Sequence, residues 1–254
     1  MMSRRELFLE EIGLTPLWRL KSREVGGGKG EEEDRSASVA AVPAALARPA
    51  SAQTAIDADD RAGRIARMGW AELKQSVAAC TACGLRKTCT QTVFGVGDER
   101  ADWLLVGEAP GAEEDARGEP FVGQAGKLLD AMLAGIGLKR GEDVYIANVL
   151  KCRPPGNRNP AHAEMAQCSS FLARQVELIR PRLILAMGRF ACQSLLDTDA
   201  SIASLRGRLH RYQGVPLIVT YHPAYLLRSL PDKAKAWEDL CFARRTMAGL
   251  VAQA

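Results

Sequence analysis

Four short apolar segments alternate with helical patterns in the part of the chain that follows about residue 65. The apolar segments are Trp103–Val106, Val144–Val149, Leu183–Met187 and Val215–Thr220. Such short, continuous runs are typical of strands buried on both faces of a parallel sheet. Helical spacing marks about Ala125–Ile136, Ala161–Ile179, Phe190–Leu196 and Lys233–Leu250. The second of these is expected to begin at Asn159-Pro160, a cap residue followed by proline.

This alternation predicts an α/β fold with right-handed crossovers and helices on both faces of the sheet. Ligands bind such sheets beyond the carboxyl ends of the strands. Unusual residues follow three of the predicted strands: Gly107–Gly111, Asn148, and Tyr221–Pro223. We therefore expect an active site at this edge of the sheet.

The first 64 residues differ in character from the rest. Residues 1–23 predict a short helix, and residues 24–64 combine glycines, an acidic run and an Ala/Pro/Ser stretch. The second segment cannot bury enough apolar area to offset its ordering entropy, so we expect a disordered linker before a domain of residues 65–254. The helix could be a terminus that packs loosely on this domain, or it could dock an unknown protein partner.

Composition and charge limit the class of protein. Of the 254 residues, 47% are hydrophobic and 25% are charged, which excludes collagen-like and wholly disordered chains. The start has no signal-peptide core, and no apolar run approaches the ~18 residues of a spanning helix. We therefore expect a cytoplasmic protein. The net charge of the chain is +4, and the excess of positive charge lies in residues 66–254, which permits a polyanionic partner.

The seven cysteines are expected to be reduced in that compartment. Cys80 and Cys83 form a C-x2-C pair, whereas Cys152 and Cys168 are far apart. Four thiolates can hold zinc or an iron–sulfur cluster, and one tight pair with one wide pair favours [4Fe-4S] without excluding zinc. Cys89 could compete as a ligand. The remaining two, Cys192 and Cys241, are expected to be small buried hydrophobes.

Carboxylates and an aromatic ring follow the first predicted strand. Glu108 stands before a Pro-Gly turn, where its carboxylate would point into the cleft. The carboxylates of residues 113–115 would lie in the first turn of the next helix, where its dipole favours negative charge. Phe121 lies in a glycine-rich loop, so a stacking platform competes there with an ordinary core position.

Two more polar residues complete the predicted edge. Asn148 offers an amide donor and an acceptor together, as needed to read an imide, and His222 is held by the following proline. A dinucleotide fingerprint and a G-x-x-x-x-G-K-[ST] phosphate loop are both missing, which disfavours nucleotide-triphosphate chemistry.

Several long motifs in register resemble the bacterial family 4 uracil-DNA glycosylases of the iron–sulfur type. They are Gly107–Gly111 with Glu114-Asp115, Pro120–Gly123, Asn148 with Lys151–Pro155, and His222–Arg228. The resemblance covers roughly residues 70–250. It implies a three-layer α/β/α sandwich around a four-stranded parallel sheet, a [4Fe-4S] cluster, and removal of uracil from single- or double-stranded DNA by a monomer that starts base excision repair.

The resemblance also implies roles for individual residues. The catalytic pair would be Glu108, which orients water, and His222, which stabilises the departing uracil anion. Uracil would be bound by Gly107, Glu108, Pro110, Gly111, Phe121, Asn148 and His222. DNA would be bound by Leu226, Leu227 and Arg228, with one of the leucines entering the duplex. The cluster would be held by Cys80, Cys83, Cys152 and Cys168.

The chain departs from the family pattern in a few places. Residues 1 to about 65 exceed the family core, and Ala224 stands where many relatives carry serine, a small-for-small change. The basic, histidine-containing insertion of related enzymes that cross-link to DNA is missing, so we expect turnover. Two other functions remain open, an iron–sulfur electron carrier and a catalytically silent nucleic-acid-binding module.

Overall fold

The computed structural model describes residues 61–252. The predicted N-terminal helix of residues 1–23 and nearly all of the predicted linker of residues 24–64 lie outside the described residues, so both stay predictions. The first described residues, 61–65, form a helical turn. Its Ile65 is buried together with Leu73, Val77 and Phe171.

A six-stranded sheet with the order β1-β3-β2-β4-β6-β5 forms the centre of the fold. The strands are β1 (Val96–Gly97), β2 (Trp103–Gly107), β3 (Val144–Asn148), β4 (Leu183–Met187), β5 (His210–Tyr212) and β6 (Val215–Thr220). The four central strands are parallel, which confirms the predicted four-stranded parallel sheet. The antiparallel edge strands β1 and β5 were not predicted, because two or three residues are too few to show a strand period.

The long helices agree with the predicted ranges to within two residues at each end. They are α5 (Gln124–Gly135), α6 (His162–Ile179), α7 (Arg189–Leu196) and α10 (Asp232–Ala252). The shorter elements are α3 (Trp70–Ala78), η1 (Gly84–Lys87), α4 (Ala112–Arg117), η2 (Pro155–Asn157), α8 (Ile202–Leu205) and α9 (Pro223–Leu226). No described helix is long and apolar enough to cross a membrane.

The start of α6 corrects one expectation. Asn159 is not its N-cap: the cap residue is Ala161, whose backbone N–H donates to the Glu164 carboxylate at 2.9 Å. That carboxylate is also paired with Arg158. A charge-assisted bond from the third helical residue therefore caps α6, and the proline lies before the helix instead of in its first turn.

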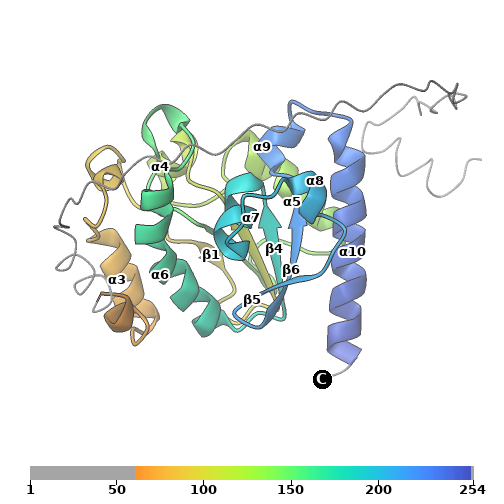
Figure 1. Ribbon diagram of the computed structural model, residues 1–254, viewed down its shortest axis with the longest axis horizontal. Helices are drawn as coiled ribbons and strands as arrows, with labels where there is room; N and C mark the ends of the chain where they lie inside the picture. Colours follow the sequence, from red (N-terminus) through yellow and green to blue (C-terminus); the bar gives the residue numbers. More distant parts are fainter. Residues whose placement is uncertain (1–60, 253–254) are drawn as a thin grey trace, which may run out of the picture. The chain divides into compact units, whose positions relative to one another are not determined.

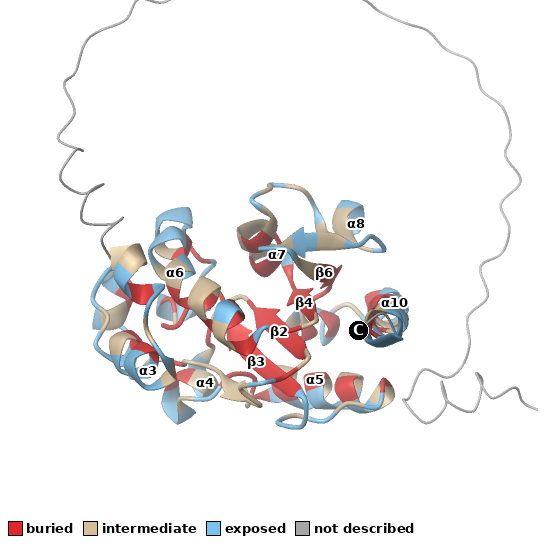
Figure 2. Cartoon of the chain, turned by 90° about the horizontal axis from the view of Figure 1, so that it is seen from below, coloured by how far each residue is buried: buried red, intermediate tan, exposed pale blue. Residues whose placement is uncertain are grey.

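The fold has three layers, as predicted, because helices pack on both faces of the sheet. On one side, alternate strand residues pack against α6 and α7. On the other side, the remaining strand residues pack against α5 and α10. Figure 2 shows the buried strands between these two pairs of helices. Because helices cover both faces, every residue of β2, β3 and β4 is buried.

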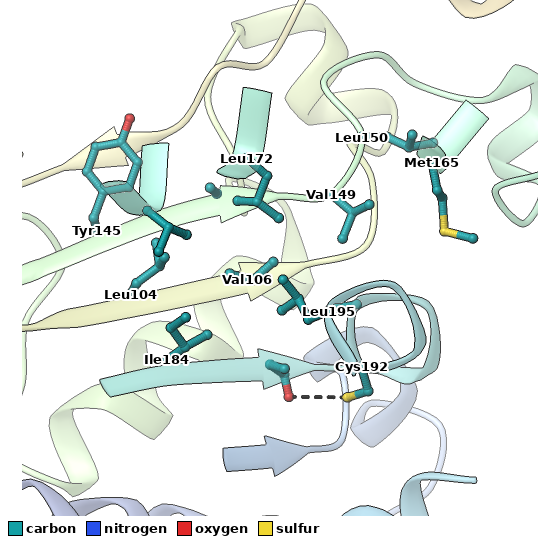
Figure 3. Close-up of a cluster of buried hydrophobic side chains, with 14 of the residues drawn as sticks. Leu104, Val106, Tyr145, Val149, Leu150, Met165, Leu172, Ile184, Cys192 and Leu195 are labelled. Atoms are coloured by element: carbon teal, nitrogen blue, oxygen red, sulfur yellow. Dashed lines mark hydrogen bonds between the residues drawn. The ribbon is translucent and has the colours of Figure 1, made fainter. Parts of the chain in front are cut away.

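Figure 3 shows the core on the α6/α7 side, where Leu104 and Val106 of β2 face Leu172 of α6 and Leu195 of α7. Cys192 is fully buried there, and its thiol donates to the Ala186 carbonyl at 3.6 Å, which confirms its structural role. Cys241 on α10, which was expected to be a small buried hydrophobe, is only partly buried.

The carboxyl ends of the parallel strands lie at one edge, and the segments that carry the predicted site residues start there. Figure 1 shows α9 beyond the arrowheads of β4 and β6. The paired residues Gly107 and Asn148 end β2 and β3 side by side in the register.

Candidate active site

Gly107 brings two site residues to one point. A Cβ atom at this position would lie 2.4 Å from Asn148 Oδ1 and 2.6 Å from Phe121 Cζ, closer than any side chain allows. Only glycine therefore lets the amide at the end of β3 and the aromatic ring of the loop between α4 and α5 approach the end of β2.

Glu108 directly follows this glycine, and its backbone carbonyl accepts a hydrogen bond from Leu150 N–H at 3.0 Å. The loops after β2 and β3 are thus joined. Burial raises the pKa of the Glu108 carboxyl to about 7, and Arg189 at the start of α7 partly offsets this. A carboxyl with this pKa can exchange a proton near neutral pH, which suits a general base. The next residues, Pro110 and Gly111, form the turn into α4.

Asn148 is only 2% exposed, and its Oδ1 atom is buried without a hydrogen-bond partner. Leaving a buried acceptor unpaired costs about 1–3 kcal/mol. The atom lies beside the Phe121 ring, as the two contacts near Gly107 show. This acceptor is therefore an unpaired buried group that the N–H of a bound ligand would satisfy.

The loop that carries Phe121 is held by Glu114 of α4. One Glu114 carboxylate oxygen accepts from Val122 N–H and Gly123 N–H at 3.0 and 3.2 Å, and the other accepts from Gly111 N–H at 3.1 Å. Its neighbour Asp115 is buried and accepts from Thr90. These carboxylates organise the loops around the site, as well as lying in the first turn of α4 as expected.

His222 lies next to Phe121, with ring centroids 5.3 Å apart and an angle of 28° between the planes. Its Nδ1 atom accepts from Ala224 N–H at 3.1 Å, so in the neutral ring the proton lies on Nε2. Burial lowers the pKa of His222 to about 4, and Arg228 lowers it further against the opposing effect of Glu114. At neutral pH His222 is therefore a neutral donor through Nε2.

The structure separates the two leucines proposed to enter DNA. Leu226 is 1% exposed and packs with Tyr221 and Ala236, so without DNA its side chain lies in the core, and its contact with the duplex stays a prediction. Leu227 is 43% exposed, and Arg228 beside it is also exposed. Leu230 in the same segment is 58% exposed, and nothing in its sequence context distinguishes it from a core leucine.

The four predicted ligands Cys80, Cys83, Cys152 and Cys168 line one cavity, although they come from distant segments of the chain. Burial raises the pKa of the Cys152 thiol, and the thiols of Cys89, Cys168 and Cys83 raise it further. Burial also raises the pKa of Cys168, against the opposing effect of Lys151. Within residues 61–252, no three His, Cys, Asp or Glu side chains are arranged to hold one metal ion.

Lys151 connects this cavity to the polar edge of the sheet, a role that could not be predicted from its position in the sequence. Its side chain is buried, and its Nζ atom donates to the Asn148 carbonyl at 2.8 Å and to Gln175 Oε1 at 2.6 Å. Burial lowers the pKa of Lys151 to about 8. The lysine thereby ties the end of β3 to α6, which also carries Cys168.

The amino-acid sequence was compared with protein families and with known proteins. The model of the uracil DNA glycosylase superfamily matches residues 94–241, which is more than half of the chain. The chain belongs to this superfamily. It is 49% identical over 164 residues to the type-4 uracil-DNA glycosylase of Archaeoglobus fulgidus, covering 61% of this chain and 82% of that protein.

The chain is more similar in sequence to type-4 than to type-5 uracil-DNA glycosylases. The type-4 uracil-DNA glycosylase of Thermotoga maritima is 45% identical over 165 residues, covering 64% of this chain and 85% of that protein. The type-5 enzyme of Pyrobaculum aerophilum is 35% identical over 146 residues, covering 51% of this chain and 64% of that protein. The greater identity and coverage place the chain with the type-4 uracil-DNA glycosylases.

Proposed function

We propose that this type-4 family member flips uracil out of DNA and hydrolyses its N-glycosidic bond, leaving an abasic site that starts base excision repair. The observation that carries the proposal is the buried, unpaired Oδ1 of Asn148 beside the Phe121 ring. An imide base satisfies both groups at once, because it stacks on the ring while its N–H donates to the amide oxygen.

Base selectivity follows from the two ends of the Asn148 amide. Its Oδ1 would accept from uracil N3–H, and its NH2 group would donate to O4. Cytosine presents an amino group where uracil has O4, and it lacks the proton on N3. With cytosine, an acceptor would face the Asn148 oxygen and a donor would face its NH2 group. Neither hydrogen bond could form, so the site would reject this base.

Hydrolysis places opposite charges near Glu108 and His222. Breaking the bond between N1 and C1′ leaves positive charge on the sugar and negative charge on uracil. The Glu108 carboxylate would orient water toward C1′ and accept its proton, and His222 Nε2–H would donate to uracil O2. Such a donor is worth on the order of 3 kcal/mol in an acyl-transfer oxyanion hole. The departing uracil finally takes up a proton.

Uracil within a duplex must leave the base stack, at a cost of a few kcal/mol. Leu227 is exposed in the segment that follows His222, where it could fill the gap that the base leaves. Arg228 could bind a backbone phosphate, which would position the duplex without reading its sequence.

We expect replacement of Leu227 with alanine to lower the cleavage rate about tenfold on duplex DNA and less than twofold on single strands, because only a duplex must be held open. The exposed Val251 in the last turn of α10 provides a control, and its alanine variant should match the wild type on both substrates. Equal losses on single- and double-stranded substrates would exclude Leu227 from this role.

The four cysteines are proposed to hold a [4Fe-4S] cluster. Four thiols around a cavity suit a cluster, in which each thiolate binds a different iron, whereas four sulfurs on one zinc ion at about 2.3 Å must converge on a point. When bound, the cluster would cross-link three parts of the chain: the segment before β1, the loop after β3 and helix α6.

We expect the purified protein to be brown, with absorbance near ~400 nm that is lost in Cys152→Ala and Cys168→Ala. Loss of the cross-link should lower the melting temperature by about 10 °C. The control is Cys89→Ala, since this cysteine lies beside Cys152 but outside the proposed ligand set. If Cys89→Ala also loses the absorbance, or if the active protein is colourless with one bound zinc, the assignment is wrong.

The activity itself is tested with the full chain, loaded with its cluster, on oligonucleotides that contain a single uracil, cytosine or thymine. We expect free uracil and an alkali-labile abasic site from the first oligonucleotide only, with many turnovers. An electron carrier or a silent binding module would release no base. Either outcome separates the proposal from those two alternatives.

A further inference from the structure

Arg140 lies in the short segment between α5 and β3, and its guanidinium holds the backbone of the Phe121 loop. Nη1 donates to the Pro120 carbonyl at 2.9 Å, and Nη2 donates to the Phe121 carbonyl at 2.8 Å. Nε donates to the Asp130 carboxylate of α5 at 3.0 Å. One planar group thus fixes two consecutive carbonyls, a geometry that the ammonium group of lysine cannot reproduce.

The backbone at Phe121 needs such support. Its φ angle is +55°, a left-handed conformation that is uncommon for a bulky residue. Gly126 in the first turn of α5 is part of the same arrangement, since a Cβ there would lie 1.8 Å from the Phe121 carbonyl oxygen. A residue in this conformation persists only where its surroundings determine it.

Two charged side chains hold the loop through different backbone groups. Arg140 binds the carbonyls of Pro120 and Phe121, whereas Glu114 binds the N–H groups of Val122 and Gly123. Bonds to ionised groups are stronger than neutral ones. Both the carbonyl groups and the N–H groups of the backbone around Phe121 are therefore held, and this sets the orientation of the ring.

We propose that Arg140 is a positioning residue for base recognition, because it sets the stacking surface that Phe121 offers to uracil. The inference rests on the proposed function. Arg140 binds the loop through backbone carbonyls and acts on uracil through the Phe121 ring. That ring would contact uracil both before and after the bond breaks. Loss of Arg140 should therefore weaken binding of uracil more than it slows bond cleavage.

The experiment compares Arg140→Gln with Arg174→Gln. Arg174 makes the same kinds of contact, from Nε to the Met68 carbonyl at 2.7 Å and from Nη1 to Glu177 at 2.8 Å, but it is not part of the uracil site. The inhibition constant of free uracil, KM and kcat are measured with uracil-containing single strands, together with the melting temperature.

We expect Arg140→Gln to raise the inhibition constant of free uracil and KM about tenfold, with kcat within twofold of the wild type. Arg174→Gln should leave all three within twofold, even if it lowers the melting temperature as much. An inhibition constant for Arg140→Gln equal to that of the wild type or of Arg174→Gln would overturn the inference.

Arg140→Lys keeps the inference testable if the glutamine variant does not fold. Lysine retains the positive charge but cannot bind both carbonyls with one planar group. We therefore expect the inhibition constant of uracil to rise about threefold. An unchanged value would overturn the inference. A wild-type protein that releases no uracil would instead contradict the proposed function, so the two failures are distinguishable.

Discussion

Replacing Glu108 with glutamine is expected to lower the single-turnover rate of uracil release by about a hundredfold or more, with little change in affinity for uracil-containing DNA. General bases contribute about 10²–10⁴ to rates. Glutamine keeps the shape of the side chain but can neither take a proton from water nor offset the sugar cation. Single-turnover rates at saturating enzyme measure the effect on cleavage, and DNA titrations measure the effect on affinity.

The pH dependence provides a second arm of the same prediction. Because burial raises the pKa of Glu108 to about 7, the carboxylate forms only as the pH rises through that value. The wild-type rate should therefore increase tenfold per pH unit below about 7 and level off above it. His222 stays neutral over this range, since its pKa is about 4.

The control is Glu113→Gln, which changes a carboxylate of α4 whose side chain is 55% exposed. It should keep both the rate and the pH profile. A Glu108→Gln variant that binds DNA poorly but cleaves at the normal rate when saturated would contradict a catalytic role for Glu108. So would a variant that retains the increase in rate around pH 7.

Asn148→Asp is expected to lower uracil excision on the order of a thousandfold, because the new side chain cannot donate to O4 and places a carboxylate in a buried site. The same carboxylate can accept from the N4 amino group of cytosine. The rate on uracil divided by the rate on cytosine should therefore fall by a larger factor than the rate on uracil does.

Single-turnover rates on oligonucleotides with uracil or cytosine measure both effects. Asn159→Asp is the matched control, because this asparagine is exposed in the loop before α6. An unchanged uracil rate in Asn148→Asp would remove Asn148 from base recognition and, with it, the observation on which the proposed function depends.

The parallel sheet could be predicted because its four strands are continuous apolar runs, and burial on both faces makes such runs distinct. The converging edge could also be predicted, since Gly107 and Asn148 end neighbouring strands in the observed register. Strand order requires long-range pairing, which a local pattern does not encode. The edge strands β1 and β5 are too short to leave a period at all.

Roles that depend on three-dimensional packing were not predictable. Leu226 and Leu227 are identical in sequence terms, and only the short helix α9 makes one buried and the other exposed. Arg140 looks like any surface arginine until its guanidinium is seen on two carbonyls some twenty residues earlier. Lys151 is a comparable case, because charged side chains are rarely expected to be fully buried.

The most direct test of the account is a crystal structure of the full-length Glu108→Gln variant, loaded with its cluster, in complex with an uncleaved uracil-containing oligonucleotide. The account predicts a flipped uracil stacked on Phe121, with its N3 atom within hydrogen-bond distance of Asn148 Oδ1 and its O2 atom facing His222 Nε2. A uracil that remains in the base stack, or that lies away from Asn148 and Phe121, would contradict it.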